Sequence, residues 1–156
     1  MLLEIARLWH ESGYKPKRSV LFAAWGAQEL GQAGSQHFVQ YPTVPIENVI
    51  GMLQLDGVGG GEGFNLGANG SWEQDGSLIF NLSAASISLD EKLIITPSSV
   101  ESDHLSFHQA DIPAVLIAWR LANEDNLPDS IAQAVHPSRL GETGRITSLS
   151  LMNLAR

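Results

Sequence analysis

Apolar residues follow two patterns along this chain, one that repeats with the period of a helix and one that forms short unbroken runs. The helical spacing predicts amphipathic helices at residues 2–13, 30–41, 77–87 and 143–156. A continuous apolar run suits a strand that is covered on both faces, and such runs predict strands at residues 19–25, 49–55, 92–96 and 113–119. The remaining stretches predict a strand-like link at 64–70, a polar loop that becomes a short helix at 98–110, and loops across 120–141.

Strands that alternate with helices are typical of a three-layer α/β/α fold, in which helices cover both faces of a sheet. Gly13 and Pro16 end the first predicted helix, and Pro42 stops the second. No internal repeat, low-complexity run or linker divides the sequence. We therefore expect one domain over residues 1–156.

Composition and charge exclude several classes of protein. The chain has 156 residues, 44% of them hydrophobic, which is enough for a sizeable core. Its net charge of −8 argues against a nucleic-acid surface, which needs clustered Lys and Arg. No apolar run is long enough to span a bilayer, and the first residues lack the pattern of a signal peptide, so we expect a soluble protein whose compartment the sequence leaves open. Because the chain has no cysteine, a metal ion would have to be held by His, Asp or Glu.

Polar residues stand at the ends of several predicted strands. Glu29 follows the first strand, Asp56 ends the second and precedes a glycine-rich loop, and His136 lies in the loop after the last strand. A parallel sheet would bring these three side chains to one edge, where open α/β sheets usually place their chemistry. Two carboxylates and an imidazole suit zinc or a similar divalent ion, although a turn Asp and a helix-capping Glu would give the same pattern without a site.

A second group of candidates lies between residues 102 and 108. His104 and His108 are four residues apart, a spacing that can chelate a metal from one helix face, but the Glu of the metalloprotease helix motif is missing. Packing histidines are the alternative. Ser102, Asp103 and His104 are consecutive, so their side chains do not converge and we do not expect a catalytic triad.

Three segments resemble motifs of the di-zinc aminopeptidase family, which also contains glutamate carboxypeptidase, glutaminyl cyclase and the non-catalytic transferrin receptor. Residues 25–35, Trp-Gly-Ala-Gln-Glu-Leu-Gly-Gln-Ala-Gly-Ser, resemble its Gly-Ala-Glu-Glu-Leu-Gly-Leu-X-Gly-Ser motif. Residues 53–59 are similar to its Asn-Leu-Asp-Met-Val-Gly segment, and residues 102–115 to its Ser-Asp-His-X-X-Phe…Gly-Ile-Pro-Ala segment. The last motif places Asp103 and His104 near the site. The resemblance implies a three-layer sandwich with a mixed, mostly parallel sheet.

The resemblance also implies a role for each strand-end residue. Glu29 and His136 would bind one zinc ion, and Asp56 would bind the other. Gln28 takes the position of the general base, where the family has a Glu. The family supplies a further His and the Asp that bridges both metals from a segment upstream of the helix that residues 2–7 resemble. The site is therefore expected to be incomplete, with no zinc or one weakly bound ion.

The expected function follows from these matches and departures. The family hydrolyses N-terminal peptide bonds with a metal-activated water, so a peptide is the expected substrate. Because Gln28 is not a base and the upstream ligands are absent, we expect this chain alone to be inactive or nearly so. The alternative is a non-catalytic binding domain that retains the peptidase fold. An N-terminally truncated sheet would leave one edge uncovered, which predicts a homo-oligomer.

Overall fold

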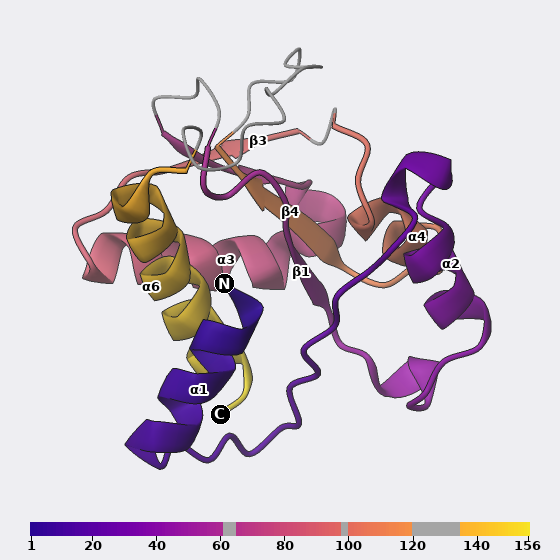
Figure 1. The fold of residues 1–156 in the computed structure, drawn as a ribbon, viewed down its shortest axis with the longest axis horizontal. Helices are drawn as coiled ribbons and strands as arrows, with labels where there is room; N and C mark the ends of the chain where they lie inside the picture. Colours follow the sequence, from indigo (N-terminus) through magenta and orange to yellow (C-terminus); the bar gives the residue numbers. More distant parts are fainter. Residues whose placement is uncertain (61–64, 98–99, 120–134) are drawn as a thin grey trace.

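A four-stranded sheet lies at the centre of the chain in this computed structural model, which describes residues 1–60, 65–97, 100–119 and 135–156 (Figure 1). The strand order is β1-β4-β2-β3, with β1 at Met52–Leu55, β2 at Leu66–Asn69, β3 at Leu93–Thr96 and β4 at Ala114–Ala118. β1 pairs with β4 and β2 with β3 in parallel, whereas β2 and β4 are antiparallel. The predicted mixed, mostly parallel sheet is therefore confirmed.

Helices surround this sheet at nearly the predicted positions. They are α1 at Leu2–Ser12, α2 at Ala33–Gln40, α3 at Trp72–Ser88, α4 at His104–His108 and α6 at Pro137–Leu154. Two 3₁₀ turns, η1 at Gln28–Leu30 and η2 at Ile46–Asn48, connect them. No helix among the described residues is long and apolar enough to cross a membrane.

The last helix begins earlier than the sequence predicts. Loops were expected across 120–141 and a helix only from residue 143, but α6 already begins at Pro137. Proline suits the first turn of a helix, because its fixed φ fits and its missing N–H has no partner there in any case. The loop prediction is thus wrong for residues 137–141, and its part at 120–134 lies outside the described residues.

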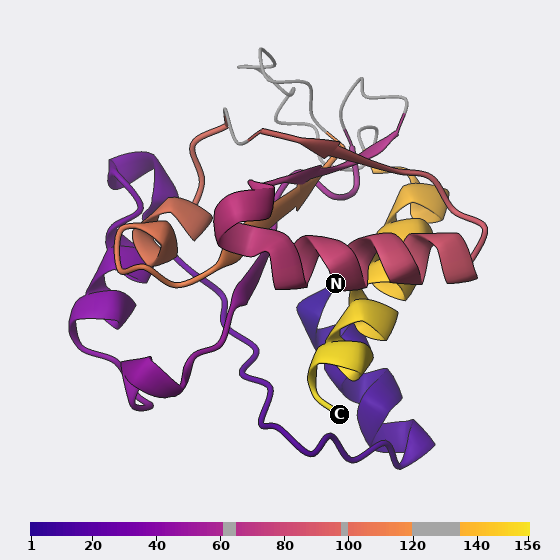
Figure 2. The same cartoon turned by 180° about the vertical axis from the view of Figure 1, so that it is seen from behind.

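The two faces of the sheet carry different helices, as the alternation along β4 shows. Val115, Ile117 and Trp119 join the larger core cluster with residues of α3 and α6. Ala114 belongs to a second cluster, with Phe38 of α2, Phe107 of α4 and the partly buried Met52 of β1. Figure 2 shows α3 across one face with α6 beside it, while α2 and α4 lie together at the other side of the molecule. Helices on both faces confirm the three-layer arrangement.

The N-terminal helix α1 lies against α6. Ile5 and Trp9 are buried, and the Trp9 indole Nε1 donates to Ser148 Oγ of α6 at 2.7 Å. Gly13 ends the helix in the left-handed conformation at φ 70°, which favours glycine. The predicted helix over 2–13 and its stop are confirmed.

The predicted strand at 19–25 is wrong. These residues run beside β1 without joining a ladder in the described part of the chain (Figure 1). Backbone hydrogen bonds fix the residues that flank the segment. Arg18 N donates to Ala155 O at 3.1 Å, and Gly34 N donates to Gly26 O at 3.2 Å. An apolar run becomes a strand only when a neighbouring edge pairs with it. Here the run is not paired with β1, and Leu21 remains 56% exposed.

Candidate functional site

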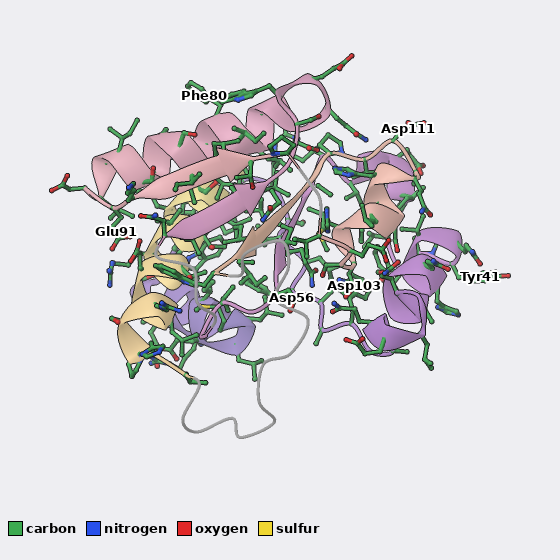
Figure 3. All side chains as sticks on the ribbon, turned by 90° about the horizontal axis from the view of Figure 1, so that it is seen from above. Tyr41, Asp56, Phe80, Glu91, Asp103 and Asp111 are labelled. Carbon is green, nitrogen blue, oxygen red and sulfur yellow. The ribbon has the colours of Figure 1, made fainter. Side chains whose placement is uncertain are left out.

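Three segments meet beyond the C-terminal end of β1. The first is η1, the second is the residue that follows β1, and the third is the turn before α4. Asp56 N donates to Ile117 O at 3.2 Å, which extends the pairing of β1 with β4 by one residue. This hydrogen bond fixes the backbone of Asp56 at the end of the strand. Gly57 then turns the chain away at φ 62°, a conformation that few other residues adopt. Figure 3 labels Asp56 and Asp103 in this region.

Asp56 receives two neutral donors on one carboxylate oxygen. Gln28 Nε2 and Ser102 Oγ each donate to Asp56 Oδ2 at 3.1 Å. Hydrogen bonds to an ionised carboxylate are stronger than neutral ones, so this cluster joins η1, the end of β1 and the turn before α4. We name Gln28, Asp56 and Ser102 the strand-end cluster.

The turn that carries Gln28 has a specific backbone. Ala27 and Gln32, on either side of η1, adopt left-handed conformations at φ 58° and 57°. Such non-glycine residues cost about 1–3 kcal/mol each and often lie at functional sites. Gly34 is required for another reason, because a Cβ there would collide with Gly26 O. The glycine-rich motif therefore folds η1 back against the start of α2.

A second polar cluster lies next to the first. Asp103 is 1% exposed and accepts a hydrogen bond from Ser35 Oγ at 2.6 Å. Ser35 Oγ also lies 2.8 Å from Ser106 Oγ. These bonds tie α2 to α4 and hold the Asp103 carboxylate beside the strand-end cluster. Asp103 was predicted near the site, whereas nothing in the pattern pointed to Ser106, and Ser35 was quoted only as part of the motif.

The two other predicted ligands have exposed side chains. Glu29 is exposed on η1, and His136 is exposed at the start of α6, where its backbone N donates to Gly59 O at 2.7 Å. In the part of the chain that the structure describes, no group of three or more His, Asp or Glu side chains is arranged to hold a metal ion. As arranged, the described residues do not fit zinc, and Glu29, Asp56 and His136 stay predicted ligands.

The His104–His108 pair packs between α3 and the rest of α4. His108 Nε2 lies 2.9 Å from Asp75 Oδ1, and the fully buried Asp75 also accepts from Ala114 N at 2.9 Å and Ser71 N at 2.8 Å. The two imidazole rings meet edge to face at 5.5 Å. Burial, and then the neighbouring charge of His108, lower the pKa of His104 to about 4. His104 is therefore neutral near pH 7, and Asp75, which the sequence did not single out, anchors α4 to α3 and β4.

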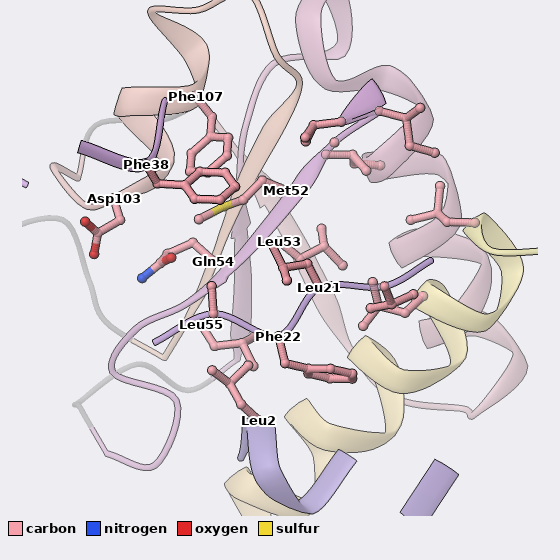
Figure 4. A pocket seen from close by; sticks show the side chains of 18 of the residues that line it. Leu2, Leu21, Phe22, Phe38, Met52, Leu53, Gln54, Leu55, Asp103 and Phe107 are labelled. Atoms are coloured by element: carbon pink, nitrogen blue, oxygen red, sulfur yellow. The ribbon is translucent and has the colours of Figure 1, made fainter. Parts of the chain in front are cut away.

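A groove runs from the strand-end cluster along β1. Its walls are the extended residues 18–25 on one side and residues 48–56 on the other. Gln28, Asp56 and Asp103 line one end, and most of the remaining lining side chains are apolar, with Arg18 and Asn48 among the exceptions. In Figure 4, Asp103 and Gln54 lie toward one end, with Leu21 and Leu2 farther along. An apolar groove with a few convergent polar groups is typical of a binding site.

Comparison with known proteins identifies the family. The sequence matches peptidase family M28 over residues 1–148, and the chain belongs to that family. The probable glutamate carboxypeptidase AMP1 of Arabidopsis thaliana is 30% identical over 131 residues, which are 73% of this chain and 18% of that protein.

Solved structures show the same fold. The zinc aminopeptidase BSAP of Bacillus subtilis superposes with a TM-score of 0.84 at 23% identity, over 99% of this chain and 40% of that one. The aminopeptidase of Aneurinibacillus sp. strain AM-1 gives a TM-score of 0.82 at 26% identity, over 99% of this chain and 37% of that one. The predicted family and fold are confirmed, and the chain spans less than half the length of these proteins.

Proposed function

We propose that this chain is part of a zinc metallopeptidase domain of the aminopeptidase type with peptide N-termini as substrates, and that residues 1–156 alone bind zinc weakly or not at all and hydrolyse peptides little or not at all. The family match and the hydrolase relatives support the first part. The second part rests on one observation, the amide of Gln28 that donates to Asp56 from the position of the family's general base.

The chemistry of the amide explains why this position matters. An amide has no basic site comparable to a carboxylate, so Gln28 does not accept a proton from water near neutral pH. Its Nε2 is moreover committed to Asp56 Oδ2 at 3.1 Å. Loss of a general base typically lowers the rate by about 10²–10⁴-fold. Asp56 and Asp103 remain at the polar end of the groove, where carboxylates suit a cationic peptide N-terminus.

Hydrolysis of aminoacyl nitroanilides tests this proposal. Rigorously purified chain, assayed with added zinc, should release no nitroaniline above the rate of an Asp56→Ala variant. Zinc-dependent release that the Asp56→Ala variant loses would contradict the predicted inactivity.

A second experiment distinguishes an incomplete peptidase from a non-catalytic binding domain. Fusion to the upstream segment of a family member, together with Gln28→Glu, should restore hydrolysis if the domain is a peptidase that lacks its base. The same fusion with Gln28 kept is the matched control and should remain far slower. Inactivity of the repaired protein would instead favour the alternative, a non-catalytic domain that binds peptides or proteins through the peptidase fold.

A further inference from the structure

We infer that the strand-end cluster is built to be independent of a metal ion, because Gln28 and Ser102 supply the positive ends of hydrogen bonds where a cation would otherwise neutralise Asp56. The inference goes beyond the proposed function, since it concerns what stabilises the site rather than what the site hydrolyses. It rests on the misfit between the family's metal chemistry and the donors found here.

The geometry of the two donors carries the argument. Both hydrogen bonds converge on the same oxygen, Asp56 Oδ2, at 3.1 Å. Ser102 is fully buried, while Gln28 and Asp56 are partly buried. An oxygen that accepts two protein donors has its lone pairs engaged, so a metal ion could bind Asp56 through Oδ2 only by displacing one of these donors.

The neighbouring carboxylates do not offer a substitute ligand set. Asp103 is held by Ser35 at 2.6 Å in its own buried cluster. Glu29 lies at an exposed position on η1. Among the described residues, Asp56 is consequently not part of a group of three acidic or imidazole side chains around one cation position.

The identity of residue 28 decides the electrostatics. A Glu in the place of Gln28 would bring a second carboxylate to about the hydrogen-bond distance from Asp56, and two such charges need a cation or a shared proton between them. The Gln28 amide has the same shape as a Glu carboxylate. Its interaction with Asp56 is attractive and not repulsive, because its N–H donates a hydrogen bond. The family pattern with Glu thus requires a counter-ion at this point, and the Gln28 pattern removes that requirement.

Thermal unfolding of metal-stripped protein, with and without about 1 mM zinc, tests the inference. The wild-type chain should unfold at the same temperature in both conditions. Gln28→Glu should unfold about 3 °C or more lower without zinc, and zinc should restore most of this loss. Gln40→Glu, an exposed glutamine of α2 that receives the same charge change, is the matched control and should respond to neither.

Two results of this experiment would overturn the inference. A zinc-induced rise in the unfolding temperature of the wild-type chain, lost in Asp56→Asn, would overturn the inference, and this arm does not depend on the Gln28 variant folding. A Gln28→Glu variant as stable as Gln40→Glu, or one that zinc fails to restore, would overturn it as well. Because no arm measures hydrolysis, failure here leaves the proposed peptidase function to its own test.

Discussion

At the scale of single residues, the site is defined by which polar atoms reach each carboxylate. Asp56 and Asp103 lie side by side in the fold, yet each has its own donors, Gln28 and Ser102 for the first and Ser35 for the second. Removing a donor from a buried carboxylate costs about 1–3 kcal/mol or more. These hydroxyl and amide donors therefore hold the site together without a metal ion.

The sequence could predict some of these residues and not others. Gln28, Asp56 and Asp103 follow from strand-end positions and motifs, and they do line one end of the groove. Asp75 could not be found in this way, because its distant partners Ala114 and His108 are brought to it only by the packing of α3 against β4 and α4. A buried polar contact between distant segments leaves no periodic signal along the chain.

The titration of His104 gives a prediction at this scale. Its pKa is lowered from 6.5 to about 4 in the folded chain, so the unfolded chain binds the proton first as the pH falls. Stability is therefore full above pH 6.5 and is lost toward pH 4, by up to about 3 kcal/mol at 1.36 kcal/mol per unit. Urea unfolding at about pH 7 and about pH 4.5 should show this loss.

The matched variants isolate the residue responsible. His104→Gln should reduce the pH dependence of the unfolding free energy, whereas His10→Gln, at an exposed histidine of α1, should leave it unchanged. The neighbouring groups that act electrostatically on His104 are His108, Asp75 and Asp56. An unchanged slope in His104→Gln would assign the pH dependence to one of them instead.

At the scale of elements, the helices and three of the four predicted strands agree with the structure. α1 and β4 were predictable from their apolar patterns, whereas α3 begins at Trp72, before the predicted start at residue 77, because Ser71 caps it there. The conformation of residues 19–25 was not predictable. An apolar run becomes a strand only if another strand pairs with it, and the sequence pattern does not show whether such a partner is present. The segment still delivers Gln28 to the site.

The Gly34 contact gives a prediction for the turn that carries Gln28. Gly34→Ala would push a Cβ against the Gly26 carbonyl and force η1 away from α2. Such overpacking typically destabilises by about 1–3 kcal/mol. Chemical unfolding should show this loss, and zinc should not reverse it.

Gly76→Ala is the internal comparison for this change. Gly76 lies inside α3, and a Cβ there meets nothing within 4 Å. Alanine is the better helix former, so this variant should gain about 0.5–1 kcal/mol. Equal effects of the two substitutions would show that the approach of Gly34 to Gly26 does not stabilise the motif.

At the scale of the whole molecule, β1 is an edge strand of the sheet that the described residues form. β1 pairs with β4 on one side, and across the groove lie the unladdered residues 18–25. Exposed edges and apolar runs pair readily with other chains. The homo-oligomer expected from the sequence therefore remains a prediction, as does the assignment of residues 1–156 to one partial domain.

Self-association can be measured directly. Sedimentation equilibrium should show a mass that rises with concentration toward a dimer, through exchange or pairing at this edge. Leu21→Lys, which places a charge on the 56% exposed side chain beside the groove, should weaken the association. Ile87→Lys, at an exposed apolar residue of α3, should not. A monomer at every concentration would contradict the prediction.

Gln28 and Ser102, and not a metal ion, are predicted to satisfy Asp56 in this chain. Calorimetric titration of zinc into the metal-stripped protein, with Asp56→Asn as the companion variant, measures this. We predict no saturable heat for either protein. Binding of about one equivalent of zinc that disappears in Asp56→Asn would contradict this prediction, and would mean that Asp56 still binds the peptidase metal.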